Sequence, residues 1–277
     1  MPTLKPYSHT VNSSTQTSTP IRVVLPAYNE EKDLPRLLDR LQVSLDALDR
    51  QYEIIVVDDG SKDRTAEIAE AAAGRMPVRL VQHTVNQGLG RAMQTGLSVA
   101  ADLGGVVVTM DADNSHDPCY IAEMVAVLEQ ESMGLVIASR FRPGSQVQGV
   151  PWHRRMLSWG CFLAMKLVLP YKGVRDYSTG FRAYSPEAIR ALVEKYGDRL
   201  VEVSGFACML EILAKLRTVG APAKEIPYTL RYDEKQGVSK LRIMRTLRQY
   251  GSVVGRFWMQ VPAGAWQRSL LLMVADV

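Results

Sequence analysis

The chain has 277 residues, of which 47% are hydrophobic and 22% charged, so it is long enough for one large α/β domain with appendages or for two small domains. Its formal net charge of +4 is too small to indicate a nucleic-acid partner. Its cysteines, Cys119, Cys161 and Cys208, are far apart and odd in number, which excludes a disulfide framework and a zinc-binding spacing and suits a reducing compartment.

The first 20 residues are rich in serine and threonine and lack the hydrophobic core of a signal peptide, so we expect a disordered leader over 1–20. A membrane-spanning helix needs about 20 mostly apolar residues. The apolar stretch 156–170 is too short and contains Lys166, and the stretch 256–277 is broken by charged residues and a proline. We therefore expect no span.

Strand and helix patterns alternate through residue 140. The first expected helix carries apolar residues at helical spacing, namely Leu34, Leu37, Leu38, Leu41 and Leu45. The expected strands are 21–28, 52–61, 78–83, 105–113 and 134–140, and the expected helices are 30–48, 63–74, 90–102 and 117–130. This alternation predicts an α/β fold with a doubly wound, mostly parallel sheet and helices on both faces.

Ligands of doubly wound sheets bind beyond the carboxyl ends of the strands, so the residues that follow each strand are the candidates for function. Acidic residues follow the first, second and fourth expected strands, and arginines follow the fifth. These residues are Glu30, Asp58, Asp59, Asp111 and Asp113, then Arg140 and Arg142. Two aspartates one residue apart repel each other unless a cation lies between them. The pattern favours a metal ion held by carboxylates and a phosphorylated ligand held by arginines.

Each feature alone also fits a simpler interpretation. The run from Asp58 to Ser61 fits a turn and helix cap. The glycine-rich loop 86–92, "NQGLGRA", matches neither a Walker loop nor a dinucleotide fingerprint. A single Asp-x-Asp pair is weak evidence, but a pair at a strand end downstream of "LPAYNE" and "VVDDGS" is stronger.

Taken in order, these motifs resemble those of the family-two glycosyltransferases, which have a GT-A fold. The matching stretches are "VVLPAYNEE", "IIVVDDGSKDRT", "NQGLGRA", "MDADNSHDP", "IASRF", "STGFRAY" and "GVSK". The resemblance covers roughly residues 20–245. It is greatest to the branch that transfers a sugar from a nucleotide to a polyprenyl or dolichyl phosphate, the dolichyl-phosphate mannosyltransferases.

For the donor, the resemblance implies a metal ion and a nucleotide-sugar site. That site would consist of Pro26, Tyr28, Glu30, Asp59 and Asp111, with Asp59 near the base or ribose. Asp111 and Asp113 would hold Mg2+ or Mn2+ against the donor diphosphate, with Asp113 counted as catalytic. The family often has glutamine where this chain has Ser115, a weaker metal ligand that we nevertheless include in the expected metal site.

For the acceptor, the resemblance implies a second anion site and a mobile loop. The acceptor-phosphate site would consist of Arg140, Arg154, Ser158 and Arg182. Arg140, after the fifth strand, is the second expected catalytic residue. Arg231 and Lys240 would flank the loop "EKQGVSK", whose spacing departs from the common family pattern.

The implied reaction is an inverting, metal-dependent transfer to a lipid phosphate. A phosphate monoester is already anionic at neutral pH, so it needs no strong general base. Arginines would offset the repulsion between two phosphate-bearing reactants. The resemblance favours GDP-mannose as the nucleotide-sugar donor, with UDP-glucose as the second choice.

The C-terminal region predicts a basic amphipathic helix over 239–258. Apolar residues recur there at helical spacing, namely Ile243, Met244, Leu247, Tyr250, Val254 and Phe257, and Lys240, Arg242, Arg245, Arg248 and Arg256 take other positions. Such a helix can lie on an anionic bilayer surface, burying Ile243, Leu247, Val254 and Phe257. It can equally pack on its own domain or on a second subunit.

We therefore expect a leader over 1–20, a GT-A domain over 21–238 and a helical tail at the membrane surface over 239–277. Without a span, the chain is expected to be a peripheral protein on the cytoplasmic face of a membrane, where nucleotide sugars are available. A membrane-anchoring partner protein is left open.

Two other functions stay open. The acceptor could be a saccharide hydroxyl, which requires a carboxylate base, and Asp176 and Glu211 are the candidates for that base. Alternatively, the chain could bind a nucleotide sugar or a membrane surface without catalysis. The intact set of aspartates and arginines argues against that second alternative.

Overall fold

The computed structural model describes residues 18–150, 160, 165–166, 168–237 and 243–258. Three expected site residues, Arg154, Ser158 and Lys240, lie outside these residues, as does most of the expected leader.

Strands and helices alternate in the first half of the chain as predicted. The strands are β1 (Ile21–Ala27), β2 (Tyr52–Asp58), β3 (Val78–Gln82), β4 (Val106–Thr109), β5 (Leu135–Ser139), β6 (Gln146–Gln148), β7 (Arg182–Tyr184), β8 (Ala223–Pro227) and β9 (Thr229–Arg231). The helices are α1 (Leu34–Asp46), α2 (Thr65–Ala73), α3 (Leu89–Leu103), α4 (Tyr120–Gln130), α6 (Pro186–Tyr196), α7 (Cys208–Thr218) and α8 (Ile243–Trp258), with short 3-10 turns η1 (Gly197–Arg199) and η2 (Tyr232–Glu234).

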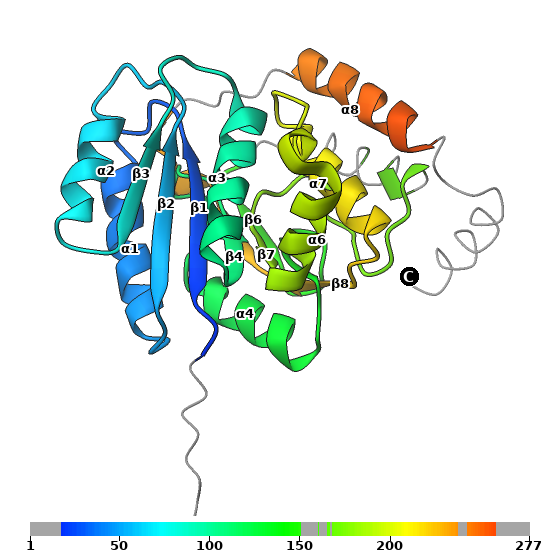
Figure 1. Cartoon of the computed structure of the whole chain (residues 1–277), viewed down its shortest axis with the longest axis horizontal. Coiled ribbons are helices and arrows are strands. Elements are labelled where there is room, and N and C mark those ends of the chain that lie inside the picture. The colour runs from blue at the N-terminus through cyan, green and yellow to red at the C-terminus, as the bar shows by residue number, and fades with distance from the viewer. Residues whose placement is uncertain (1–17, 151–159, 161–164, 167, 238–242, 259–277) are drawn as a thin grey trace, which may run out of the picture.

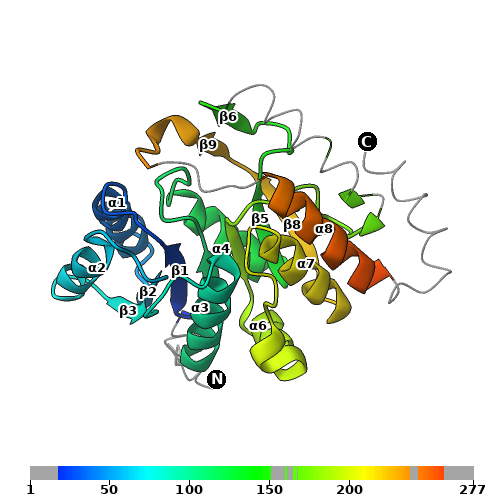
Figure 2. The same cartoon turned by 90° about the horizontal axis from the view of Figure 1, so that it is seen from above.

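A seven-stranded sheet forms the centre, in the order β3-β2-β1-β4-β7-β5-β8. All its neighbouring strands are parallel except β7, which is antiparallel to both β4 and β5. A separate parallel pair, β6 with β9, lies apart from this sheet (Figure 2). The predicted α/β fold with a mostly parallel sheet is confirmed.

Helices cover both faces of the sheet, and each face has its own hydrophobic core (Figure 1). One core contains apolar residues of α3, α6, α7 and α8. The other contains those of α1, α2 and α4, including every leucine predicted for the inner face of the first helix. Buried on both faces, β1, β2 and β4 are rich in β-branched residues, as expected for parallel strands.

No strand or helix between residue 140 and the C-terminal helix was predicted from the sequence pattern, and β7 is the one of these elements that enters the centre of the sheet. It has three residues, too few to show a period, and it begins with Arg182. Arg182 is in register with Thr109 of β4 on one side and with Ile137 of β5 on the other. Tertiary pairing therefore makes this segment a strand, and it separates β4 from β5.

Helix α8 packs on its own domain, beside α7 (Figure 2). Tyr250, Val253 and Phe257 are buried in the core shared with α7. The prediction that Val254 and Phe257 enter a lipid surface is therefore wrong, because Val254 packs against this core and Phe257 is only 7% exposed. Met244 and Leu247 remain 68% and 44% exposed. None of the described helices is both long and apolar enough to cross a membrane.

Candidate functional site

The carboxyl ends of β2, β1 and β4 lie side by side because these strands are neighbours in the sheet. Side chains after β2 hold the loop after β1. The backbone N–H of Asn29 donates to Ser61 Oγ, and that of Glu30 donates to Thr65 Oγ1, both at 2.8 Å. Pro26, Tyr28 and Glu30 are thus brought to one edge of the sheet, next to the loop after β2. Their contact with a nucleoside stays a prediction.

The turn with Asp111 and Asp113 follows β4 directly. Asn114 adopts a left-handed backbone conformation (φ 60°), which turns the chain back so that Ser115 reaches Asp113. The backbone N–H and the hydroxyl of Ser115 both donate to Asp113 Oδ1, at 3.1 and 2.5 Å. Asp113 is nearly buried, whereas the side chain of Asp111 is 38% exposed. Ser115 therefore orients Asp113, and its role as a metal ligand stays a prediction.

The two carboxylates differ electrostatically. Although burial opposes ionisation, the ammonium of Lys235 and the hydrogen bond from Ser115 hold the pKa of Asp113 below its ordinary value. Desolvation raises the pKa of Asp111, and the charge of Asp113 adds to that effect while His116 opposes it. A bound cation near both groups would favour the ionised form of each.

His116 packs against the turn that carries Asp111 and Asp113. Its Nδ1 accepts a hydrogen bond of 3.1 Å from the backbone N–H of Asp111. Its ring stacks on Phe181 at 5.1 Å and meets Tyr228 edge-on at 5.9 Å. Gly180 lies so close that an added Cβ would sit 2.9 Å from Asp111 Oδ1. This packing limits the positions open to the Asp111 carboxylate.

Lys235 places a positive charge next to the acidic turn. Its Nζ donates to Asp113 Oδ2, and the lysine and aspartate side chains are only 10% and 11% exposed. Burial opposes its charge, but Asp113, Glu30 and Asp111 together raise the pKa of Lys235. A positive group thus already lies where the sequence predicts a metal ion.

The residues fit a divalent cation that is shared with a diphosphate. Among the described residues no group of three or more His, Cys, Asp or Glu side chains could hold a metal ion alone. Magnesium is usually bound through one or two carboxylates together with substrate phosphates. Asp111 and Asp113 supply such a pair, and the ammonium beside Asp113 shows that the turn attracts a cation.

Arg140 is fixed by a buried carboxylate. Its Nε and Nη2 donate to the two oxygens of Asp176 at 2.8 and 2.7 Å, and Nη2 also donates to Ser178 Oγ at 2.6 Å. Asp176 is fully buried, while the side chain of Arg140 is 20% exposed. Although burial opposes both charges, this ion pair lowers the pKa of Asp176 and raises that of Arg140. Arg140 can therefore present a rigid, permanently charged edge to an anion.

Glu225 supports the loop that carries Asp176. Its Oε1 accepts hydrogen bonds of 2.6 Å from the backbone N–H groups of Arg175 and Asp176. Burial raises the pKa of Glu225 to about 7, and the charge of Asp176 adds to the effect.

This raised pKa predicts a loss of stability as the pH rises. At pH values below the ordinary pKa of 4.5, Glu225 is protonated in both the folded and the unfolded chain. Above that pH it ionises in the unfolded chain, whereas in the folded chain it ionises only near pH 7. The contribution of Glu225 to stability is therefore full below about pH 4 and is lost as the pH rises from about 4.5 to about 7, by about 3 kcal/mol. Chemical denaturation across this range should show the loss in the wild type and much less of it in Glu225→Gln, which keeps the accepting oxygen. Parallel pH profiles for the two proteins would contradict the assignment.

The two carboxylates proposed as bases for a saccharide acceptor are not accessible. The carboxylate of Asp176 accepts hydrogen bonds from Arg140 and from the backbone N–H groups of Ser178 and Thr179. Glu211 is fully buried, accepts from Lys215 Nζ at 2.9 Å and receives two backbone N–H groups at 2.9 Å. Neither can take a proton from an acceptor hydroxyl in this structure, so both candidates were wrong.

Asp59 is also used inside the protein. Its side chain is almost buried and accepts from the backbone N–H groups of Gln87 and Gly88, at 2.9 and 2.7 Å. His83 Nδ1 lies 2.8 Å from the same carboxylate. The structure thus gives Asp59 a positioning role for the glycine-rich loop, in place of the expected contact with the base or ribose.

The guanidinium of Arg182 lies in the core. It is fully buried and donates to the backbone carbonyls of Met209 and Tyr177, at 2.8 and 3.1 Å. An acceptor phosphate cannot reach it here, so we remove Arg182 from the acceptor site.

Arg231 is exposed in part and forms ion pairs with Asp233 and Glu234 of the same segment. Of the expected acceptor residues that the structure describes, only Arg140 reaches the site edge.

Sequence reasoning missed Lys235 and Asp33. Asp33 accepts from the backbone N–H groups of Gln236 and Gly237, at 3.1 and 3.0 Å, and so ties the loop after β9 to the start of α1. These residues are more than 200 positions apart. The acidic excess around the turn could have suggested a lysine partner, but no local pattern selects Lys235.

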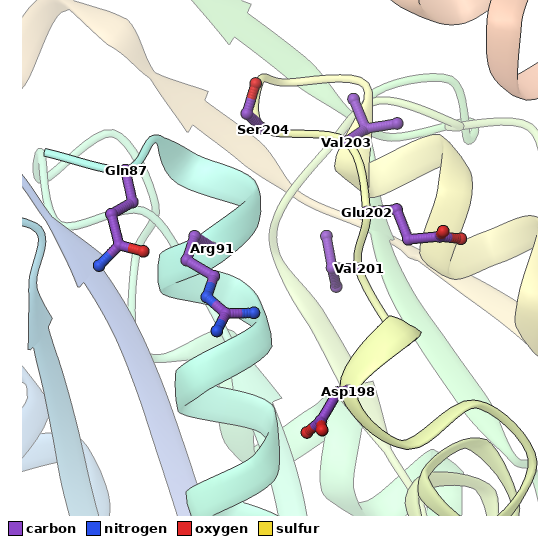
Figure 3. A pocket seen from close by; sticks show the side chains of 7 residues that line it. All are labelled: Gln87, Arg91, Asp198, Val201, Glu202, Val203 and Ser204. Atoms are coloured by element: carbon purple, nitrogen blue, oxygen red, sulfur yellow. The ribbon is translucent and has the colours of Figure 1, made fainter.

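A separate surface pocket of about 390 Å3 lies beside the glycine-rich loop (Figure 3). Gln87 and Arg91 line one side of it, and Asp198 and the segment 201–204 line the other. Its charged groups have both signs, so we assign no ligand to it.

Comparisons with known proteins agree with the motifs. Residues 22–193 match the model of the family described as Glycosyl transferase family 2. A dolichol-phosphate mannosyltransferase of Pyrococcus furiosus is 32% identical over 225 residues, which are 80% of this chain and 59% of that protein. The polyprenol monophosphomannose synthase of Mycolicibacterium smegmatis is 32% identical over 79% of this chain and 80% of its own. The undecaprenyl-phosphate mannosyltransferase of Micrococcus luteus is 30% identical over 80% and 87%, respectively.

Solved structures share the fold. Glucosyl-3-phosphoglycerate synthase from Mycobacterium tuberculosis, in complex with Mn2+, uridine diphosphate and phosphoglyceric acid, superposes with a TM-score of 0.64. The match covers 89% of this chain and 81% of that chain at 23% identity. A complex of the same enzyme with Mg2+ and uridine diphosphate gives a TM-score of 0.61 at 22% identity. At this identity the likeness shows the fold alone.

Proposed function

Because the chain belongs to glycosyl transferase family 2, as its motifs predicted, we propose that it transfers a sugar from a nucleotide donor to a polyprenyl or dolichyl phosphate with inversion. The observation that carries the proposal is the pairing of an acidic turn, Asp111 and Asp113, with the fixed guanidinium of Arg140, in a site where neither candidate carboxylate base is accessible. An acceptor that is already anionic requires no such base.

The donor half of the site is built from the acidic turn. A divalent ion, Mg2+ or Mn2+, bound there would supply Lewis-acid neutralisation of the leaving diphosphate. Asp111 and Asp113 would hold this ion, with Asp113 oriented by Ser115. Pro26 at the end of β1, with Tyr28 and Glu30 in the loop that follows, would border the nucleoside.

The acceptor half depends on Arg140. Since Asp176 and Ser178 occupy Nε and Nη2, the guanidinium cannot swing freely, and the rest of it is left for an incoming phosphate. A planar guanidinium suits the recognition of phosphate oxygens. Arg140 would bring the nucleophilic oxygen toward the sugar and offset its repulsion from the donor phosphates. Arg154 and Ser158 stay proposed members of this half on the family resemblance alone.

Mannose from GDP-mannose is the first choice of donor, since the three relatives at 30–32% identity carry mannosyltransferase or phosphomannose synthase names. UDP-glucose is the second choice, since solved structures of the same fold hold uridine diphosphate with Mn2+ or Mg2+. Incubating the purified protein with polyprenyl phosphate, Mn2+ and each donor in turn tests the choice. We expect a lipid-linked mannose, and lipid-linked glucose without mannose would reverse the order.

We propose that the chain acts at a membrane surface as a peripheral protein on the cytoplasmic face. A lipid phosphate is presented at headgroup level, so the acceptor half must approach the bilayer. The outward surface of α8, with Met244, Leu247 and Arg248, combines exposed apolar and basic groups. This combination suits an anionic lipid surface, where each basic residue contributes about 1 kcal/mol and salt screens the attraction.

Liposome flotation tests this surface. Replacing Met244, Leu247 and Arg248 together by serine should lower binding to vesicles that contain anionic lipid, because apolar and basic contacts are lost at once. Wild-type binding should fall with added salt. Val43→Ser is the matched control, since Val43 is 73% exposed on α1. Equal flotation of the triple variant and the wild type would show that lipid is bound elsewhere.

A further inference from the structure

The segment 231–237 begins at the last residue of β9, contains Lys235, and is bound to the acidic turn and to the start of α1. The backbone N–H of Arg231 donates to the carbonyl of Ser115 at 3.0 Å. At its other end, Asp33 accepts from the backbone N–H groups of Gln236 and Gly237. Asn114 Nδ2 in turn donates to the backbone carbonyl of Asp33 at 2.6 Å. The segment thus has fixed ends, and Lys235 lies between them.

Lys235 is the contact that joins the middle of this segment to the site. Its ammonium binds Asp113 Oδ2, the oxygen that Ser115 leaves open, because Ser115 uses Oδ1. The pair is almost closed to solvent, so its attraction is screened less than that of a surface ion pair. The end of the segment also lies close to Asp33 and Glu30, since a Cβ added at Gly237 would lie 3.3 Å from Asp33 Oδ2 and 3.4 Å from Glu30 Oε2.

A metal ion and this ammonium need the same oxygen. Asp113 offers only Oδ2, and two cations cannot occupy one carboxylate oxygen without repelling each other. We propose that Lys235 competes with the divalent ion for Asp113, and that metal loading releases Lys235 and the middle of segment 231–237 with it. This inference rests on the metal-dependent function proposed above.

The competition for Asp113 makes the binding of the metal ion depend on the nucleotide. A metal ion alone must displace an ammonium from a buried partner, so it binds weakly. A nucleoside diphosphate brings new anionic oxygens, which can accept both the metal ion and the displaced ammonium. Metal and nucleotide therefore bind cooperatively, and Lys235 couples their binding to the position of segment 231–237.

Titration of Mn2+ in the absence of nucleotide tests the competition, with bound Mn2+ followed by electron paramagnetic resonance. Lys235→Met removes the competing charge and should tighten Mn2+ binding by about tenfold. Lys235→Arg keeps a cation and should bind Mn2+ as the wild type does. Lys224→Met is the control, because Lys224 also pairs with a carboxylate, Glu131, far from the site. Unchanged or weaker Mn2+ binding by Lys235→Met would overturn the proposal.

A second measurement uses the wild type alone and does not depend on how a variant folds. Acetylation of lysines by an activated ester, read by mass spectrometry, should be slow at Lys235 and rise severalfold on addition of Mn2+, with no change at Lys224. Unchanged acetylation at saturating Mn2+ would contradict the release. If Mn2+ binds together with nucleotide but both measurements show no competition, the metal-dependent function stands and only this inference fails. If no Mn2+ binds under either condition, both fail.

Discussion

Asp113→Asn is expected to lower sugar transfer by roughly 10²–10³-fold, a range typical for loss of one electrostatic group that acts on the developing charge. The variant keeps the oxygen that accepts from Ser115 but removes the negative charge that would hold a divalent ion. The fold should survive with some loss of stability, because the residue lies outside both hydrophobic cores but is the ion-pair partner of Lys235. Initial rates at saturating donor and acceptor, with and without EDTA, provide the measurement.

The matched control for this variant is Asp117→Asn, four residues further along. Asp117 forms an ion pair with Arg40 at 2.8 Å and accepts a hydrogen bond from the backbone N–H of Cys119 at 3.0 Å, so its partners differ from those of Asp113. It should lose some stability and keep its transfer rate. Full activity of Asp113→Asn, or of the wild type in EDTA, would remove the metal ion from the mechanism.

Arg140→Lys is expected to weaken the use of polyprenyl phosphate by about tenfold or more and to leave the KM for the donor nearly unchanged. A lysine keeps the charge, but its single ammonium cannot hold both oxygens of Asp176 and also present a fixed edge to a phosphate. Steady-state kinetics with each substrate varied in turn separates the two effects. A raised KM for the donor with an unchanged KM for the acceptor would mean that the two phosphate positions are reversed.

The alanine variant answers a different question. Arg140→Ala leaves Asp176 buried without its partner, so we expect a loss of about 3–5 kcal/mol of stability in addition to lost activity.

Arg50→Lys is the control for the Arg140→Lys change. Arg50 pairs through two hydrogen bonds with Glu129 on the surface, and its replacement should affect neither substrate.

The sequence predicted the parts of the fold that local pattern encodes. The leucines of α1 and the β-branched runs of β1, β2 and β4 define their elements without help from the rest of the chain. The strand β7 could not be predicted, because three residues have no period and the pairing with β4 and β5 decides their conformation. For α8 the helix was predicted but its buried face only in part, because Tyr250 and Phe257 are buried whereas Met244 and Leu247 are exposed. The choice between core and lipid depended on α7, which the pattern of one helix cannot reveal.

The position of candidate residues was predictable at the strand ends. Asp111, Asp113 and Arg140 were placed this way, since the ends of parallel strands share one edge, and their functional roles stay predictions. Residue type alone gave wrong predictions at Asp59 and Arg182, because a charged side chain near a site can instead form its hydrogen bonds with backbone groups of the protein. Lys235 was missed because its partner Asp113 is 122 positions away in the chain.

The proposed function depends most on the identity of the acceptor, and one comparison of two acceptors tests that identity directly. The protein is incubated with labelled donor, Mn2+ and either a polyprenyl phosphate or the matching polyprenol without phosphate, and the label extracted into the lipid phase is measured. We predict transfer to the phosphate and none to the alcohol. Arg140 would bind an anionic acceptor, and the carboxylates considered as bases for a hydroxyl acceptor, Asp176 and Glu211, are buried and paired. Equal transfer to the polyprenol, or transfer only to a saccharide hydroxyl, would contradict the account.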